Sequence, residues 1–127
     1  FNTNKTLWCG WVFEAKNFKC MFVGDTGYSK DFLTIQEKFG FMDLSLIPIG
    51  AYAPRWFMKD HHCNVEEAIQ IHKDLKSKKS IAMHWGTFQL TDEPMDEPII
   101  LLKKLAVEKN LSNDEFIAMT HGESKSI

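Results

Sequence analysis

The sequence predicts an α/β fold in which strands and helices alternate and build a largely parallel sheet. Short runs rich in aromatic and β-branched residues alternate with segments of helical periodicity, in the order β-β-α-β-α-β-α-β. The hydrophobic fraction is 44% and the aromatic fraction 13%, which is enough for a buried core. No internal repeat, low-complexity tract or linker interrupts the pattern, so we expect residues 1–127 to form a single unit.

The first two strands form a predicted hairpin. Its strand-like runs are Leu7 to Phe13 and Phe18 to Val23, and the "EAKN" segment between them suits a tight connection. Apolar residues with helical spacing follow in "SKDFLTIQEKF", where Ser29 is the expected N-cap. The next segment, Leu44 to Ile49, is nearly all apolar, which predicts a strand buried on both faces.

The clearest helix is predicted in "NVEEAIQIHKDLKSKK". Asn64 and Glu67 resemble a capping box, and we interpret His72 as a packing residue on the apolar face of this helix. "SIAMHW" then predicts a short buried strand. A third helix spans roughly Asp96 to Lys109, with Pro98 early in it and a leucine stripe along it. "EFIAMT" closes the pattern as the last strand.

The charge and cysteine content argue against several classes of protein. The formal net charge is −2, from 15 basic and 17 acidic residues, so there is no strong electrostatic case for a nucleic-acid partner. The three cysteines are widely spaced and form no C-x-x-C pair, which argues against a disulfide framework and for a reducing, intracellular location. No apolar run approaches the roughly 18 residues of a membrane span.

Residues that could carry chemistry collect where predicted strands end. Asp25 follows the second strand between two glycines, His84 ends "SIAMH", and His62 lies in the loop after the third strand. His121 and Glu123 follow the last strand. Because ligands of open α/β sheets bind outside the carboxyl ends of the strands, these side chains could share a metal or acid–base site.

Each of these residues also has a purely structural interpretation. Asp25 could be a turn residue that bonds its own backbone, and His84 could be a hydrogen-bonded core histidine. His62 could lie on the surface, and Glu123 could be a tail carboxylate. Spacing alone leaves both interpretations open.

Several short sequence motifs favour the metal site over the structural interpretation. "FVGDTGY", "IPIGAYAPRWFMKDHH", "EEAIQIHKD", "KSIAMHWGTFQL" and "HGES" together resemble the C-terminal half of the N-acyl-phosphatidylethanolamine-hydrolysing phospholipase D family. That family belongs to the zinc-dependent metallo-β-lactamase superfamily. The resemblance implies the C-terminal half of an αββα sandwich, with helices on one face of the sheet and an open apolar surface on the other.

The resemblance also implies roles for individual residues. Asp25, in "GDTGY", would bridge two zinc ions, and His84, in "HWGTF", would ligate one of them. His62 would lie in the catalytic pocket, in contact with the phosphate or assisting the leaving group. Tyr52 and Trp56 would line the pocket or an acyl groove, although structural packing is an equal alternative for both.

The implied activity is zinc-dependent hydrolysis of a phosphodiester, which releases an N-acylethanolamine and phosphatidic acid. The implied partners are a phospholipid substrate, a membrane surface contacted peripherally, and a second subunit in a homodimer. The superfamily signature H-x-H-x-D-H is absent from these 127 residues, so this chain supplies only part of the ligand set. The chain begins at Phe1, and we expect the remainder upstream. The alternatives are a truncated, silent binding or regulatory half and a sister metallo-hydrolase with another substrate.

Overall fold

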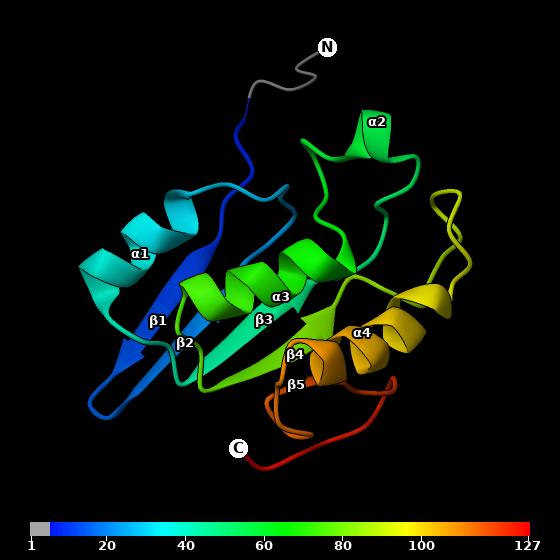
Figure 1. Ribbon diagram of the computed structural model, residues 1–127. Coiled ribbons are helices and arrows are strands. Elements are labelled where there is room, and N and C mark those ends of the chain that lie inside the picture. The colour runs from blue at the N-terminus through cyan, green and yellow to red at the C-terminus, as the bar shows by residue number, and fades with distance from the viewer. Residues whose placement is uncertain (1–5) are drawn as a thin grey trace.

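A five-stranded sheet in the order β1-β2-β3-β4-β5 carries helices on one face, as the computed structural model of residues 6–127 shows (Figure 1). The first two strands are antiparallel, and each later strand adds in parallel. The strands are β1 (Trp11–Ala15), β2 (Phe18–Phe22), β3 (Leu44–Pro48), β4 (Lys79–Met83) and β5 (Phe116–Ala118). The predicted mixed α/β fold is therefore confirmed.

The helices fall between the strands as predicted, with one addition. They are α1 (Asp31–Phe39), α2 (Arg55–Met58), α3 (Val65–Asp74) and α4 (Glu97–Glu108). The short α2 was not predicted, because its four residues are too few to show a helical period. Nη2 of Arg55, at the start of α2, donates to both carboxylate oxygens of Glu67 in α3, at 2.9 and 2.8 Å, and this ion pair fixes α2 against the helix that follows.

Several boundary predictions were wrong. The first strand spans Trp11–Ala15 rather than Leu7 to Phe13, and its ladder with β2 begins at the pair of Trp11 and Phe22. Glu14 and Ala15 pair with Lys19 and Phe18, so the connection between the two strands is shorter than the predicted "EAKN". The N-cap of α1 is Lys30 rather than Ser29, whose hydroxyl instead contacts the carboxylate of Asp31 at 2.9 Å.

The capping box of α3 is confirmed. The side chain of Asn64 accepts the backbone N–H of Glu67, and the carboxylate of Glu67 accepts the backbone N–H of Asn64, both at 2.9 Å. The helix buries its apolar face against the sheet, and the core between helices and sheet includes Met42, Ile47, Ile49, Ile69, Ile71, Leu75 and Leu102. His72 lies in this core, as predicted.

The opposite face of the sheet is apolar and open, as expected from helices on one side only. Trp11 and Phe13 of β1 are 61% and 57% exposed, and Phe18 and Phe22 lie opposite Ala15 and Trp11 on the neighbouring strand. Contiguous exposed apolar surface of this kind marks a place where another layer can pack.

The buried His72 makes the stability of the fold depend on pH. Its Nδ1 lies 2.8 Å from the hydroxyl of Ser80 and its Nε2 lies 3.1 Å from the carboxylate of Glu115. Burial lowers the pKa of His72, and the opposing effect of Glu115 does not restore it. The unfolded chain therefore takes up a proton at a pH where the folded chain does not.

We expect the free energy of unfolding to fall as pH drops below about 6.5, the pKa of an unperturbed histidine. Urea unfolding at several pH values, with a chelator present, measures this slope. In His72→Gln the slope should be shallower, whereas His61→Gln, at an exposed position, should leave it unchanged. An equal slope in the natural protein and His72→Gln would contradict the assignment.

Candidate metal centre

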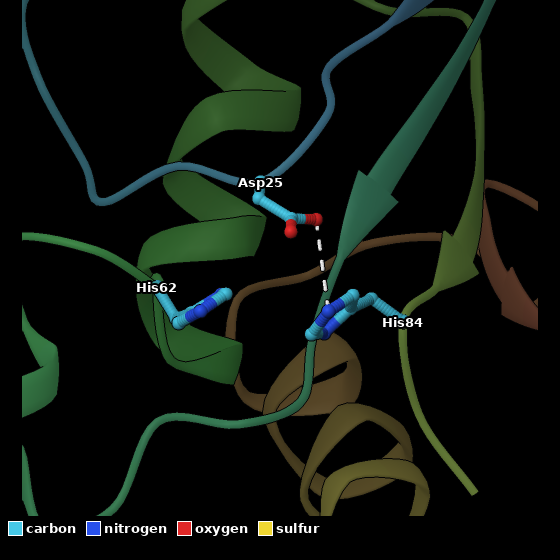
Figure 2. A group of neighbouring side chains, drawn as sticks. All are labelled: Asp25, His62 and His84. Carbon is cyan, nitrogen blue, oxygen red and sulfur yellow. Dashed lines mark ion pairs between the residues drawn. The ribbon is translucent and has the colours of Figure 1, made fainter. Parts of the chain in front are cut away.

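Asp25, His62 and His84 converge beyond the carboxyl ends of the parallel strands. Asp25 follows β2, His84 directly follows β4, and His62 lies between α2 and the start of α3. Each contributes one possible ligand atom, and these atoms all lie within 4.8 Å of one another (Figure 2). Chain segments far apart in the sequence thus bring a carboxylate and two imidazoles to one place.

The geometry of this cluster fits a metal ion. The carboxylate of Asp25 lies 3.6 Å from Nε2 of His84, and the rings of His62 and His84 stack with centroids 5.1 Å apart. The Nδ1 atoms of both histidines are buried and have no hydrogen-bond partner among the described residues. Buried imidazole nitrogens without a partner are costly, and imidazole and carboxylate are common metal ligands, so the cluster suits a metal ion.

The environment of His62 favours its neutral form. Burial lowers the pKa of His62, the adjacent His84 lowers it further, and the carboxylate of Asp25 only partly opposes both. Neutral imidazole is the form that binds a metal or accepts a proton. The ring of Trp8 covers His62 with a centroid distance of 5.7 Å, a contact that the sequence did not indicate.

The backbone at His84 is tightly constrained. His84 adopts a left-handed conformation with φ 57°, which is uncommon for a residue with a side chain. Gly50 lies directly against it, and a Cβ at position 50 would overlap the carbonyl oxygen of His84. The close approach of these two strand ends therefore requires glycine at position 50. It also fixes the backbone position from which the His84 side chain extends.

Glu93 is a buried residue that sequence reasoning missed. Its carboxylate accepts the backbone N–H groups of Ala51 at 2.6 Å, Tyr52 at 3.2 Å and Ala53 at 3.0 Å, and the hydroxyl of Thr91 at 2.8 Å. Burial alone would raise the pKa of Glu93, but these hydrogen bonds together hold it below its ordinary value. Glu93 lies in a polar stretch of the sequence, and no local pattern there indicates that its side chain is buried.

The other predicted site residues lie outside the cluster. Tyr52 is buried, and its hydroxyl donates to Glu97 at 2.6 Å. Trp56, on α2, is 81% exposed and packs beside Phe57 with ring centroids 5.7 Å apart. The side chain of Tyr52 thus takes part in packing with α4, while that of Trp56 faces solvent.

His121 and Glu123 form part of a separate contact. Nε2 of His121 lies 3.1 Å from the hydroxyl of Thr87, in the loop that follows His84. Glu123 accepts the backbone N–H of Thr120 at 2.9 Å. His121 therefore connects the segment after β5 to the loop after β4, whereas Glu123 closes its own local turn, and neither joins the cluster.

The chain belongs to the β-lactamase superfamily, because residues 1–85 match the Beta-lactamase superfamily domain. Within it, the chain is 44% identical over 123 residues to N-acyl-phosphatidylethanolamine-hydrolyzing phospholipase D 1 of Caenorhabditis elegans. It is 43% identical over 108 residues to the mitochondrial N-acyl-phosphatidylethanolamine-hydrolyzing phospholipase D of Saccharomyces cerevisiae. These alignments cover 94% and 83% of this chain, but 35% and 23% of the two relatives.

Solved structures agree with this assignment. An isothiocyanate hydrolase from gut bacteria of Delia radicum superposes with a TM-score of 0.74 at 19% identity, over 94% of this chain and 43% of that one. A zinc-dependent hydrolase of the metallo-β-lactamase superfamily from Thermotoga maritima superposes with a TM-score of 0.56 at 26% identity, over 76% of this chain and 44% of that one. The first likeness shows the fold alone.

Among the described residues, no helix has both the length and the apolar character needed to span a bilayer.

Proposed function

We propose that this chain supplies part of the centre of a zinc-dependent phosphodiester hydrolase of the phospholipase D type. Its substrate would be N-acyl-phosphatidylethanolamine, and its products an N-acylethanolamine and phosphatidic acid. The convergence of Asp25, His62 and His84 is the observation that carries this proposal. The 44% identity to the C. elegans phospholipase D over nearly the whole chain supports the substrate class.

The three residues would have distinct roles. Asp25 and His84 would hold the metal, and the two oxygens of the Asp25 carboxylate allow it to serve two ions. Bound zinc supplies a Lewis acid that activates water and stabilises negative charge on a phosphoryl group. His62, whose lowered pKa favours the neutral form and whose ring lies beside that of Trp8, would contact the phosphate or pass a proton to the leaving oxygen. A two-zinc centre needs further ligands, which residues beyond this cluster would provide.

The setting of the reaction follows from the substrate. A phospholipid is presented at a bilayer surface, so we propose that the protein contacts the membrane peripherally. The unpaired cysteines favour an intracellular location, and the family resemblance implies a homodimer. Hydrolysis of radiolabelled N-acyl-phosphatidylethanolamine in vesicles by the natural protein, expressed from its full coding sequence, tests the activity. A panel that includes a lactone and a simple aryl phosphodiester separates this activity from that of a sister hydrolase. Turnover of the lactone alone would overturn the phospholipase assignment.

His62→Ala is expected to leave zinc bound while reducing turnover by about 10²- to 10⁴-fold, the range typical of lost acid–base assistance. Zinc content by elemental analysis and the rate of hydrolysis, measured on the same preparation, check this. His61→Ala, at the exposed neighbouring position, is the matched control and should keep both values. If His62→Ala lost its zinc, His62 would be a ligand rather than a substrate contact.

A further inference from the structure

His62 is the residue of the cluster that no strand positions. Asp25 and His84 follow β2 and β4 closely, whereas His62 lies in the loop of residues 59–64 between α2 and α3. Figure 1 shows α2 set apart from the sheet and joined to the rest of the chain by loops. The Nδ1 atom of His62 is buried and has no hydrogen-bond partner among the described residues. Because a reactive side chain has to be held by its surroundings, the orientation of this ring depends on its backbone and on the rings beside it.

The backbone of His62 is bound on both sides by α2. Its N–H donates to the carbonyl oxygen of Met58, the last residue of this helix, at 2.8 Å. Its carbonyl oxygen accepts a hydrogen bond from Nη1 of Arg55, the first residue of the same helix, also at 2.8 Å. The peptide groups before and after the imidazole are therefore both fixed to one short helix.

The same loop packs directly on the loop between β2 and α1. The N–H of Cys63 donates to the carbonyl oxygen of Thr26 at 2.7 Å. A Cβ at Gly27 would overlap the carbonyl oxygen of Lys59, so the two loops lie closer together than a side chain at this position would allow. With α2 in place, this contact sets how far the ring of His62 lies from the neighbouring loop.

The place of α2 depends in turn on Arg55. While Nη1 of Arg55 bonds the backbone of His62, Nη2 donates to the carboxylate of Glu67 in α3. Glu67 is itself fixed by the capping box with Asn64. One planar guanidinium thus joins α3 to the peptide group of His62. A lysine has a single ammonium nitrogen and could not present two separate donor nitrogens in this way.

We propose that Arg55 is a positioning residue that acts through His62. By bonding Glu67 and the carbonyl oxygen of His62 together, it holds the imidazole beside the pair formed by Asp25 and His84. The assignment rests on the proposed function, in which His62 contacts the phosphate or the leaving oxygen, and it deepens that function by naming what holds His62 in place.

The expected result is a loss of turnover without a loss of metal. In the natural protein, expressed from its full coding sequence, Arg55→Met should lower kcat by about 100-fold, the cost of displacing a reacting group by about 1 Å. Zinc affinity should not change, because among the described residues no hydrogen bond or ion pair joins Arg55 to Asp25 or His84. Lys59→Met removes an exposed cation from the same loop and is the matched control, which should keep both values. Zinc affinity that fell together with turnover in Arg55→Met would overturn the assignment.

A double variant shows whether Arg55 acts through His62. Once His62→Ala has removed the imidazole, adding Arg55→Met should lower kcat by less than about twofold further. Two independent effects would instead multiply, so a further loss of about 100-fold in the double variant would contradict the proposal.

Arg55→Lys separates positioning from a general loss of structure. Lysine keeps a positive charge opposite Glu67 at this partly exposed position, so urea unfolding should show a stability closer to that of the natural protein than Arg55→Met does. Its one ammonium cannot also fix the carbonyl oxygen of His62, so kcat should stay well below the natural value. Full turnover in Arg55→Lys would overturn the assignment.

A measurement without substrate separates this assignment from the proposed function. In protein labelled at histidine, the nuclear Overhauser effect between ring protons of His62 and His84 reports the stacking of these rings, whose centroids lie 5.1 Å apart. It should weaken in Arg55→Met and persist in Lys59→Met. If it does so while the natural protein hydrolyses no phosphodiester, the positioning role stands and the proposed function fails. If hydrolysis proceeds but Arg55→Met leaves kcat unchanged, the function stands and the positioning role fails.

Discussion

Asp25→Asn is expected to lower zinc affinity by more than about 100-fold, since even a change in an outer partner of a metal ligand costs 10- to 100-fold. Asparagine keeps the shape of the side chain but removes the negative charge that would face the cation. Hydrolysis by the Asp25→Asn variant should be several orders of magnitude slower than by the natural protein, because the metal would supply both the activated water and the charge stabilisation. Competition of the protein with a chromogenic chelator measures the affinity directly, without any assumption about the substrate.

Two further variants make this result specific. His84→Ala should have a similar effect, because the ring of His84 lies 3.6 Å from the carboxylate of Asp25. Asp60→Asn changes an exposed carboxylate near the site and should leave zinc affinity unchanged. Near-normal turnover with full zinc in both Asp25→Asn and His84→Ala would remove the metal assignment from this cluster.

The fold was largely predictable because each main element has a strong local pattern. The apolar run of β3 and the capping box of α3 specify their structures without help from distant residues. α2 has no such pattern, and its position depends on the ion pair between Arg55 and Glu67. The start of β1 likewise depends on where its partner strand ends, which periodicity in one strand cannot indicate.

The candidate site was predictable only in part. Strand ends predicted that Asp25 and His84 would meet, because parallel strands present their carboxyl ends at one edge. The approach of Gly50 to His84 and the burial of Glu93 depend on how two loops pack together. Those contacts join residues roughly forty positions apart, so no local pattern in the sequence encodes them.

Glu93→Ala is expected to destabilise the fold by about 3 kcal/mol or more, because three backbone N–H groups would lose their acceptor and each costs about 1–3 kcal/mol when buried and unpaired. Glu93→Gln keeps one oxygen acceptor and should cost less. Glu108→Gln, on the exposed surface of α4, is the control and should change stability by no more than about 0.5 kcal/mol. Urea unfolding monitored by circular dichroism measures all three.

The pH dependence identifies the charge as the source of this stability. Because the hydrogen bonds hold the pKa of Glu93 below its ordinary value, its contribution is complete above the pKa of an unfolded glutamate, about 4.3. The contribution is lost as pH falls through the lower pKa of the folded state. The difference in stability between the natural chain and Glu93→Gln should therefore be constant from neutral pH down to about 5 and shrink in more acidic solution. A difference that stayed constant through the acidic range would mean that Glu93 acts by packing, and that the Ala51–Ala53 turn beside His84 does not depend on its charge.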